Sequence, residues 1–369
     1  MRGKILFDPH IINIEREEND YKCIKQKHKN VQALLSKAKE RKKQGVFVVE
    51  GPKMSFEAPY DWVSAVYMSE SFFNDDRFKE EKKRFLDKTE IVSDSVFKSM
   101  SDTQTPQGVL AIVKMPHYEI DELFKGDKTE LLVLESIQDP GNLGTMIRTG
   151  EGAGVSGIIM NRTTVDIFNP KTVRSTMGSL YRVPFYITDD LPETIEYAKS
   201  KGVSLYAAHL KGKCSYDRPD YTGACGFMIG NEGNGLSDEI ADMADTYIRI
   251  PMEGAVESLN AAISATLLMY ECNRQRRLWE NNMRIWFKIY TDTHLMRDIT
   301  IENDSDDTRT HKIFKALEDA CLAFDLGKPI WLDSNVSDFK RHGKTRFTKD
   351  NFVEDIDFDF LEMHVIEED

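Results

Sequence analysis

Hydrophobic and polar positions follow two different patterns over the first part of the chain. Between residues 30 and 44 apolar side chains recur every three or four positions, which predicts an amphipathic helix that ends at Gly45. Short apolar runs follow, with a helical segment at 76–86 among them, and these predict strands at 46–51, 65–70, 89–93 and 108–114. Together they predict a small α/β domain over 21–115, after an N-terminal extension at 1–20 and before a polar linker at 116–130.

A longer alternation of strands and helices begins at Leu131. Strands are predicted at 131–136, 157–161, 182–187, 204–210, 226–232 and 246–251. Helices are predicted from about 143, near 170–180, and at 191–201, 236–244 and 259–277. Because strands alternate with helices, we expect a buried, mainly parallel sheet in a domain that spans residues 131–280.

The pattern changes again after Arg277. A strand at 283–290, a helix near 308–326, a strand at 329–333 and alternation at the end of the chain predict an α+β module over 284–369. Acidic runs in this module raise the question of a metal site, but 303–307 lacks the glycine and the final glutamate of an EF-hand loop. Charge runs are usually solvated surface, so no metal site is predicted.

Composition narrows the class of protein. No stretch approaches the roughly 18 uninterrupted apolar residues of a membrane span, and the N-terminus lacks the apolar core of a signal peptide. We therefore expect a soluble protein in the cytoplasm. The five cysteines are scattered without a CxxC pair, so we expect free thiols at Cys23, Cys214, Cys225, Cys272 and Cys321.

Charge is unevenly distributed along the chain, whose net charge is −13. Residues 21–53 carry nine lysines and one arginine against two glutamates, a local charge of +8. Residues 284–369 carry 12 basic residues against 20 acidic ones, a local charge of −8. The basic segment is expected to contact a polyanion and the acidic module is not. The candidate phosphate contacts are Lys37, Lys39, Arg41, Lys42 and Lys43.

One glycine-rich segment is misleading. Residues 152–157 match the dinucleotide-binding pattern GxGxxG, but a predicted helix precedes them and a strand follows. Dinucleotide binding requires the reverse order, so that a helix N-terminus meets the pyrophosphate. We interpret these glycines as a helix C-cap and a turn.

Three other segments combine a strand end with polar and glycine residues. The first is DPGNLGTMIRT at 139–149, where a strand passes through a Pro-Gly turn into a helix that carries Asn142 and Arg148. The second is IGNEGNGL at 229–236, whose glycines allow close backbone approach to a ligand. The third is IPMEGAVESLNAA at 250–262, with Ser258 as a possible helix N-cap. Open α/β sheets bind ligands at such carboxyl ends of strands.

In this order and at these intervals, the three segments resemble the motifs of the SpoU/TrmH family of RNA ribose 2′-O-methyltransferases, a branch of the SPOUT superfamily. The resemblance covers residues 131–277. Residues 29–51, KNVQALLSKAKERKKQGVFVVEG, are similar to the start of the family's N-terminal substrate-binding domain. Residues 284–369 lie outside the resemblance.

The resemblance implies a fold and a set of site residues. The fold is a trefoil-knotted, mainly parallel α/β sheet that binds S-adenosylmethionine, in a homodimer with active sites at the interface. The cofactor-contacting positions are Gly230, Ile250 and Leu259, with Asn231 and Met252 nearby. Arg148 matches the arginine proposed to activate the ribose hydroxyl, and its catalytic neighbours are Asn142, Glu232, Ser258 and Asn260.

The chemistry of ribose methylation suits these residue types. A ribose hydroxyl is protonated at neutral pH, so transfer benefits from activation and from accurate placement against the methyl donor. Arginine is normally always protonated, so we interpret Arg148 as a group that positions and activates the hydroxyl. Ser258 and Asn260 can hydrogen-bond the hydroxyl or a phosphate, and Glu232 can orient Arg148.

Other readings are open at this point. A catalytically silent RNA-binding protein could use the same fold, because fold does not guarantee function. A nucleotide-dependent oxidoreductase is disfavoured by the context of its GxGxxG segment. Ribosomal and transfer RNA enzymes share the three motifs, and the N-terminal domain favours ribosomal RNA as the partner.

Overall fold

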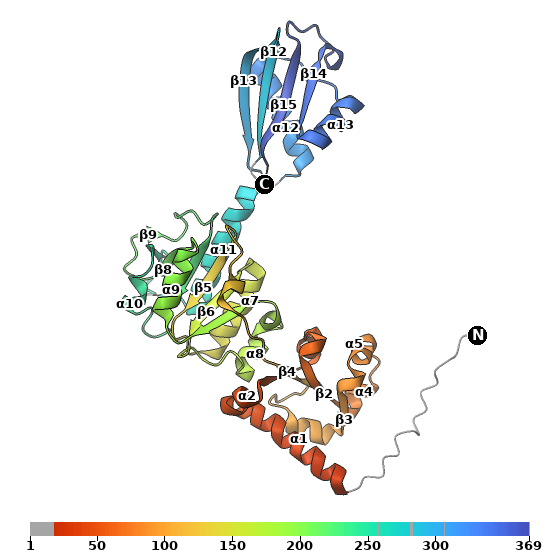
Figure 1. Cartoon of the computed structure of the whole chain (residues 1–369), viewed down its shortest axis with the longest axis vertical. Coiled ribbons are helices and arrows are strands. Elements are labelled where there is room, and N and C mark those ends of the chain that lie inside the picture. The colour runs from red at the N-terminus through yellow and green to blue at the C-terminus, as the bar shows by residue number, and fades with distance from the viewer. Residues whose placement is uncertain (1–17, 257, 281–282, 306, 369) are drawn as a thin grey trace, which may run out of the picture. The chain divides into compact units, whose positions relative to one another are not determined.

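The computed structural model describes residues 18–256, 258–280, 283–305 and 307–368 (Figure 1). The chain forms two units. The first ends at Met269 and excludes residues 220–222. The second comprises residues 220–222 and 270–369. The predicted N-terminal extension up to residue 17 and the side chain of Cys23 lie outside the described part of the chain.

The first unit begins with a small four-stranded sheet. Its order is β1-β4-β2-β3, in which β2 and β3 are parallel and the other pairs antiparallel. The strands are β1 (Val46–Glu50), β2 (Val63–Ser69), β3 (Thr89–Val92) and β4 (Val109–Lys114). The helices of this region are α1 (Glu18–Ser36), α2 (Ala38–Gln44), α3 (Pro52–Glu57), α4 (Glu70–Asn74), α5 (Lys79–Arg84) and α6 (Asp94–Met100). Val31 and Leu34 of α1 are buried against Val48 and Leu110 of the sheet.

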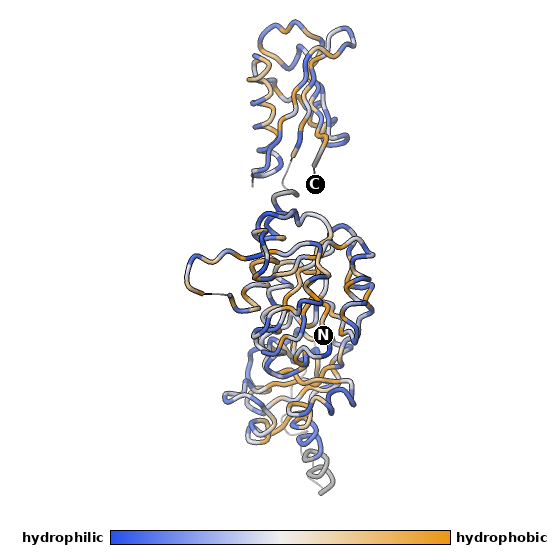
Figure 2. The backbone as a smooth tube through the Cα atoms, turned by 90° about the vertical axis from the view of Figure 1, so that its left-hand side faces the viewer, coloured by the Kyte–Doolittle hydropathy of each residue, from blue (hydrophilic) through white to orange (hydrophobic). Residues whose placement is uncertain are grey.

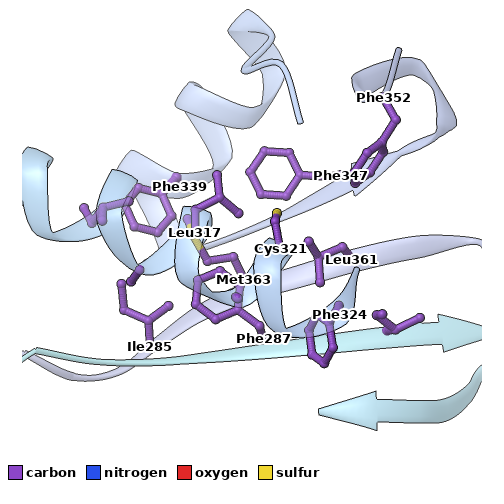
Figure 3. Packing of buried hydrophobic residues seen from close by; sticks show 14 of the residues in the cluster. Ile285, Phe287, Leu317, Cys321, Phe324, Phe339, Phe347, Phe352, Leu361 and Met363 are labelled. Atoms are coloured by element: carbon purple, nitrogen blue, oxygen red, sulfur yellow. The ribbon is translucent and has the colours of Figure 1, made fainter. Parts of the chain in front are cut away.

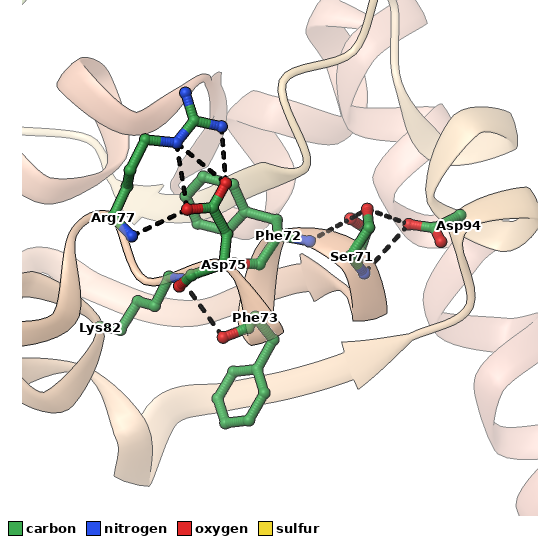
Figure 4. A network of polar contacts seen from close by, with 8 residues as sticks. Ser71, Phe72, Phe73, Asp75, Arg77, Lys82 and Asp94 are labelled. Carbon is green, nitrogen blue, oxygen red and sulfur yellow. Dashed lines mark hydrogen bonds and ion pairs between the residues drawn. The ribbon is translucent and has the colours of Figure 1, made fainter.

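Two predicted helices of this region differ from the observed ones. The predicted helix at 30–44 is interrupted at Lys37, whose backbone is extended, and Gly45 ends α2 in the left-handed region. The break is stabilised by Arg41, which donates to the carbonyls of Leu34 and Leu35 at the end of α1. The predicted helix at 76–86 is shortened to α5, and the buried Lys82 ammonium ties it to α4 by donating to the Phe72 and Asp75 carbonyls (Figure 4).

A seven-stranded parallel sheet forms the core of the first unit. Its order is β7-β6-β5-β10-β8-β11-β9, and every neighbouring pair is parallel, which confirms the predicted mainly parallel sheet. The strands are β5 (Glu130–Leu134), β6 (Gly157–Asn161), β7 (Phe185–Thr188), β8 (Ser204–Ala208), β9 (Cys214–Ser215), β10 (Cys225–Ile229) and β11 (Thr246–Arg249). β5 and β10 are buried along their whole length, and in Figure 2 hydrophobic segments of the backbone run through the interior of this region.

Helices follow most of these strands. They are α7 (Pro140–Ala153), α8 (Pro170–Thr176), α9 (Leu191–Ser200), α10 (Asp238–Ala241) and α11 (Ala261–Glu280). The glycines at 152–157 serve as predicted, because Gly154 caps α7 in the left-handed conformation and Gly157 begins β6. Leu123 packs where a Gly157 side chain would lie. A dinucleotide has no helix N-terminus to meet there.

The second unit contains a four-stranded antiparallel sheet and two helices. The strand order is β13-β12-β15-β14, with β12 (Met283–Thr291), β13 (His294–Asn303), β14 (Lys344–Thr348) and β15 (Phe360–Glu368). Helices α12 (Arg309–Phe324) and α13 (Asp333–His342) cover one face of the sheet. The core joins strand residues such as Phe287 and Leu361 to helix residues such as Leu317 and Phe339 (Figure 3).

The sequence pattern misassigned part of this second unit. The predicted strand at 329–333 is wrong. Pro329 has no N–H, and the backbone of this segment bonds to Asn351 through Ile330, and to Asn335 and Val336 through Leu332, instead of forming a strand ladder. Trp331 packs its ring against Phe339 and Phe347. β13, α13 and β14 were not predicted.

Among the described residues, no helix is long and apolar enough to cross a membrane. In the same part of the chain, no group of three or more histidine, cysteine, aspartate or glutamate side chains could hold a metal ion. Cys214, Cys225, Cys272 and Cys321 are free thiols, as predicted.

Candidate active site

A pocket of about 550 Å³ opens at the carboxyl ends of three neighbouring strands. β10, β8 and β11 are adjacent in the parallel sheet, so the loops that leave them meet at one edge. The pocket is lined by residues at the end of β8 and after it (208–210), of β10 (229–235) and of β11 (248–250 and 252), and by residues around the start of α11 (258–261 and 264). Eight of the predicted site residues lie in this lining: Gly230, Asn231, Glu232, Ile250, Met252, Ser258, Leu259 and Asn260.

The loop after β10 is folded tightly back on itself. Asn231 forms a bridge with Gly235, whose N–H donates to the Asn231 carbonyl at 2.8 Å. The Asn231 side chain accepts from the N–H groups of Gly233 and Asn234. A Cβ on Gly230 would overlap the backbone of Gly235 and Leu236. Gly230 is therefore required by the folded loop itself, and not only by an approaching ligand.

Glu232 is held by three donors at the start of α7 and directly before it. Asn142 Nδ2 donates to its carboxylate at 2.9 Å, the Gln138 N–H at 3.0 Å and the Asp139 N–H at 3.1 Å. Burial raises the pKa of Glu232, but these hydrogen bonds outweigh it, so its pKa lies below the ordinary glutamate value. The carboxylate is ionised at neutral pH and joins the loop after β10 to the start of α7.

Asn142 extends this connection to the third motif. Its side-chain oxygen accepts from Asn260 Nδ2 at 3.0 Å. The Asn260 side-chain oxygen in turn accepts from the N–H groups of Ala262 and Ile263, so Asn260 caps α11. The prediction that Ser258 is the N-cap is wrong. Ser258 lies in the loop before the helix, exposed, in the pocket lining.

The two residues should respond differently to substitution. Asn260→Ala removes the cap, which is worth about 1 kcal/mol, so hydrogen exchange at the Ala262 and Ile263 amides should become roughly five-fold faster. Ser258→Ala is the matched control, because it should leave these amides unchanged. Equal exchange in the two variants would contradict the assignment of the cap.

The strand end before α7 is strained. Ser136 has φ +56°, in the left-handed region that non-glycine residues rarely adopt. Its N–H donates to Asn161 Oδ1 and its carbonyl accepts from Asn231 Nδ2, both at 2.9 Å. Ser136 therefore joins the loops after β5, β6 and β10 beside the pocket.

Arg148 does not lie in the pocket lining. It is exposed in the third turn of α7, and among the described residues no carboxylate binds its guanidinium. Within one chain Glu232 does not contact Arg148, and its oxygens accept from Asn142 and from backbone N–H groups. The orientation of Arg148 by Glu232 stays a prediction. Within one chain, Arg148 is separate from the other predicted catalytic residues.

Comparison with known proteins identifies the family of this chain. Residues 130–270 match the model described as the SpoU rRNA Methylase family, and residues 25–111 match an MRM3-like substrate binding domain. The chain is 32% identical over 246 residues to the 23S rRNA (guanosine(2553)-2′-O)-methyltransferase RlmP of Bacillus subtilis, which covers 66% of this chain and 95% of that protein. The chain belongs to the SpoU/TrmH family of RNA 2′-O-methyltransferases.

Solved SpoU structures share its fold. The SpoU methyltransferase AviRb from Streptomyces viridochromogenes, in complex with AdoMet, matches with a TM-score of 0.61 at 27% identity. That match covers 68% of this chain and 97% of AviRb. An AdoMet-bound rRNA methyltransferase from Sinorhizobium meliloti matches with a TM-score of 0.61 at 29% identity, over 67% of this chain and 94% of that one.

Only some of the basic side chains in residues 21–53 of this SpoU/TrmH chain are exposed. Lys37, Lys39, Lys42 and Lys43 are exposed, but Arg41 is 3% exposed. Its guanidinium pairs with Asp166 at 2.6 Å, in the loop after β6, besides the two carbonyls at the end of α1. The prediction that Arg41 contacts RNA does not fit this position. Arg41 instead fixes the basic segment to the loop after β6.

Sequence reasoning missed the parts of the SpoU site that lie outside its three motifs. Residues 208–210 line the pocket at the end of β8 and after it, and Ser136 and Asn161 follow β5 and end β6. Each lies at the carboxyl end of a predicted strand, so the rule that ligands bind at this edge could have found them.

Proposed function

We propose that the chain transfers a methyl group from S-adenosylmethionine to a ribose 2′-hydroxyl of ribosomal RNA. The observation that carries this is the single pocket at the strand ends, which gathers all five predicted cofactor positions and three of the catalytic ones. RlmP and AviRb, whose names and titles give rRNA 2′-O-methylation and AdoMet binding, support it. Residues 131–280 perform the transfer and residues 21–115 bind the substrate.

The pocket fits such a cofactor in size and in chemistry. Its volume of about 550 Å³ lies within the usual range for small-molecule sites. Ile250, Met252 and Leu259 offer apolar contacts, and the backbone after β10 is bare of side chains at Gly230, Gly233 and Gly235. The ionised Glu232 is the right charge to face a cationic ligand. When bound, the cofactor supplies an electrophilic methyl group carried on a sulfonium.

The residues of this chain place the hydroxyl. Glu232, Asn142 and Asn260 form a continuous hydrogen-bonded chain, so the loop after β10 and the starts of α7 and α11 are held in one geometry. Ser258, exposed in the lining, is free to hydrogen-bond the ribose or a phosphate. Arg148 attracts the phosphate beside the ribose and orients the hydroxyl. Accurate placement of this kind is itself a large part of catalysis.

We also propose that the protein works as a homodimer with active sites at the interface. Arg148 lies outside the pocket of its own chain, so a second copy would have to bring it there. Val256 and Ile263, beside and on α11, are 60% and 49% exposed, and a second copy would cover such apolar surface. Sedimentation should give about twice the chain mass of 42.4 kDa.

A trefoil knot is part of the proposal. β10 lies between β5 and β8, which both precede it in the sequence. The chain therefore returns to the middle of the sheet after the strands on both sides of β10 have formed. The loops that line the pocket follow this return. A knotted arrangement of these loops would explain why the site is built of backbone from segments distant in the sequence.

Ribosomal RNA is the proposed substrate, and the cytoplasm is the proposed location. Mapping ribose methylation in all cellular RNA, with and without the gene, tests the substrate directly. We expect the loss of a 2′-O-methyl group in ribosomal RNA. Loss confined to transfer RNA would contradict the substrate, and an unchanged map would favour a catalytically silent RNA-binding protein.

The exposed lysines of the basic segment should account for part of the salt dependence of RNA binding. Replacing Lys39, Lys42 and Lys43 by Gln should flatten the slope of log affinity against log salt by roughly 2, because fewer counterions are released. Affinity should fall alike for all RNA sequences. The control replaces Lys79, Lys201 and Lys315, which pair with aspartates elsewhere, and should leave the slope unchanged. Equal slopes in both triple variants would refute the role of these lysines.

A further inference from the structure

Basic residues are concentrated at one place in the otherwise acidic C-terminal unit. Residues 340–349 hold five of the 12 lysines and arginines of 284–369 and no aspartate or glutamate. All five are exposed. We call them the basic edge: Lys340, Arg341, Lys344, Arg346 and Lys349.

The basic edge follows the outer strand of the sheet. Lys340 and Arg341 end α13, and Lys344 and Arg346 lie in β14, which pairs only with β15 among the described strands. Thr345 and Phe347 of the same strand are buried toward the helices, so Lys344 and Arg346 point to the opposite face. In the described part of the chain, Arg346 alone of the five pairs with a carboxylate, that of Glu362.

Aromatic rings lie on that same face. Ile285, Phe287 and Leu361 point into the core under α12 and α13 (Figure 3), so the alternate residues Trp286, Tyr290 and Phe360 point away from it. We call these three the aromatic face. Their rings are partly exposed, and the helices do not cover them.

The rings are arranged with cations around them. Tyr290 and Phe360 are cross-strand partners and stack with ring centroids 5.0 Å apart at 26°. The Arg346 guanidinium carbon lies 4.5 Å from the Phe360 centroid, which links the aromatic face to the basic edge. The Lys288 ammonium lies 3.6 Å from the Trp286 centroid. Rings beside cations are the elements with which proteins hold bases and phosphates of single strands.

The carboxylates on this face whose side chains the structure describes each have a polar partner. Glu362 pairs with Lys288 and Arg346, and Asp298 accepts from the Trp286 ring N–H at 2.9 Å. Glu302 pairs with Arg284. The net charge of −8 therefore does not describe this surface, because most of the carboxylates lie on the helices and loops.

We propose that the C-terminal unit binds single-stranded RNA, with phosphates along the basic edge and bases on the aromatic face. This rests on the proposed RNA substrate and revises the expectation that residues 284–369 do not touch RNA. A double helix does not suit the surface, because its bases stack on one another and offer no free face. Binding here would hold a single-stranded part of the substrate while the first unit acts on the ribose.

Full-length chains test this with a fluorescent single-stranded RNA of about twelve nucleotides, a length that such surfaces span. All chains carry Lys39→Gln, Lys42→Gln and Lys43→Gln, so that the N-terminal lysines contribute little. The edge variant adds Lys340→Gln, Arg341→Gln and Lys344→Gln. Phe360→Leu removes a ring and Phe360→Tyr keeps it. Anisotropy gives the affinity at several salt concentrations, and photo-cross-linking gives the contacted peptides.

The edge variant should bind about ten-fold more weakly and its salt slope should fall by roughly 2. Phe360→Leu should bind about five-fold or more weakly with an unchanged slope, and Phe360→Tyr should bind like the parent. A hairpin of the same length should bind more weakly than the single strand, and cross-links should fall within 283–368.

Parent-like binding by both the edge variant and Phe360→Leu would overturn the proposal. So would an equal loss of RNA binding and of polyglutamate binding by Phe360→Leu, since polyglutamate is a polyanion without bases and the ring would then not act by holding bases. Methyl transfer by the unsubstituted chain is measured in parallel. Active enzyme with unaffected variants refutes only the surface, and RNA binding here without any methyl transfer refutes only the proposed function.

Discussion

Arg148→Ala is expected to reduce methyl transfer by about a thousand-fold or more, while the affinity for S-adenosylmethionine stays within a few-fold of the original. The separation of the two effects follows from the structure, because Arg148 lies outside the pocket lining. Arg148→Lys should recover only a small part of the activity, since an ammonium keeps the charge but loses the planar fork of donors. Single-turnover rates and calorimetric titration of the cofactor measure the two quantities.

Mixed dimers sharpen this test. When Arg148→Ala chains are combined with Gly230→Val chains, a mixed dimer has one complete site only if Arg148 of one copy serves the pocket of the other. We therefore expect activity that neither variant has alone. If the mixture is as inactive as its components, the arginine works within its own chain. Loss of cofactor binding by Arg148→Ala would refute its assignment altogether.

Gly230→Val is expected to abolish cofactor binding, with an affinity at least about a hundred-fold lower. A valine side chain would overlap the backbone of Gly235 and Leu236, so the loop after β10 could not fold back and the pocket would lose one wall. The sheet should survive, because β10 ends before this residue. Calorimetric titration measures binding, and far-UV circular dichroism measures the sheet.

Gly254→Val is the matched control for that substitution. Gly254 belongs to the third motif, but a Cβ there would have no atom within 4 Å and its φ is not in the left-handed region. Near-normal titration is expected for this variant. Normal cofactor binding by Gly230→Val would show that the pocket lies elsewhere.

Strongly apolar segments made most of the fold predictable. The ends of β5, β6 and β10 were predicted to within three residues, because a short continuous apolar run between turn residues is typical of a buried strand. β13 was missed because its side chains are mostly exposed and only Ile299 and Ile301 alternate toward the core. The break at Lys37 depends on Arg41 reaching two carbonyls and the distant Asp166, which periodicity does not encode.

The candidate site was predictable where its functional residues lie in motifs at the ends of predicted strands. Glu232, Asn142 and Asn260 are in three motifs far apart in the sequence, and the structure joins them by hydrogen bonds. The partners of each residue could not be predicted, since they depend on loop geometry. Glu232 was expected to orient Arg148, and within one chain it holds Asn142.

Net charge was the least reliable guide. The charge of +8 over residues 21–53 includes Arg41, which is buried, and the charge of −8 over 284–369 conceals the exposed cations of 340–349. A sum along the sequence does not say which charges share a surface. Only the fold separates the face with cations from the helices and loops with carboxylates.

Transfer of a labelled methyl group to ribosomal RNA from cells that lack the gene tests the proposed activity most directly. The purified chain is incubated with this RNA and methyl-labelled S-adenosylmethionine, and the RNA is digested to nucleosides that are separated by chromatography. We expect label in a 2′-O-methylnucleoside, and none when the chain carries Arg148→Ala. Label on a base, label only in transfer RNA, or no label from a chain that binds the cofactor would contradict it.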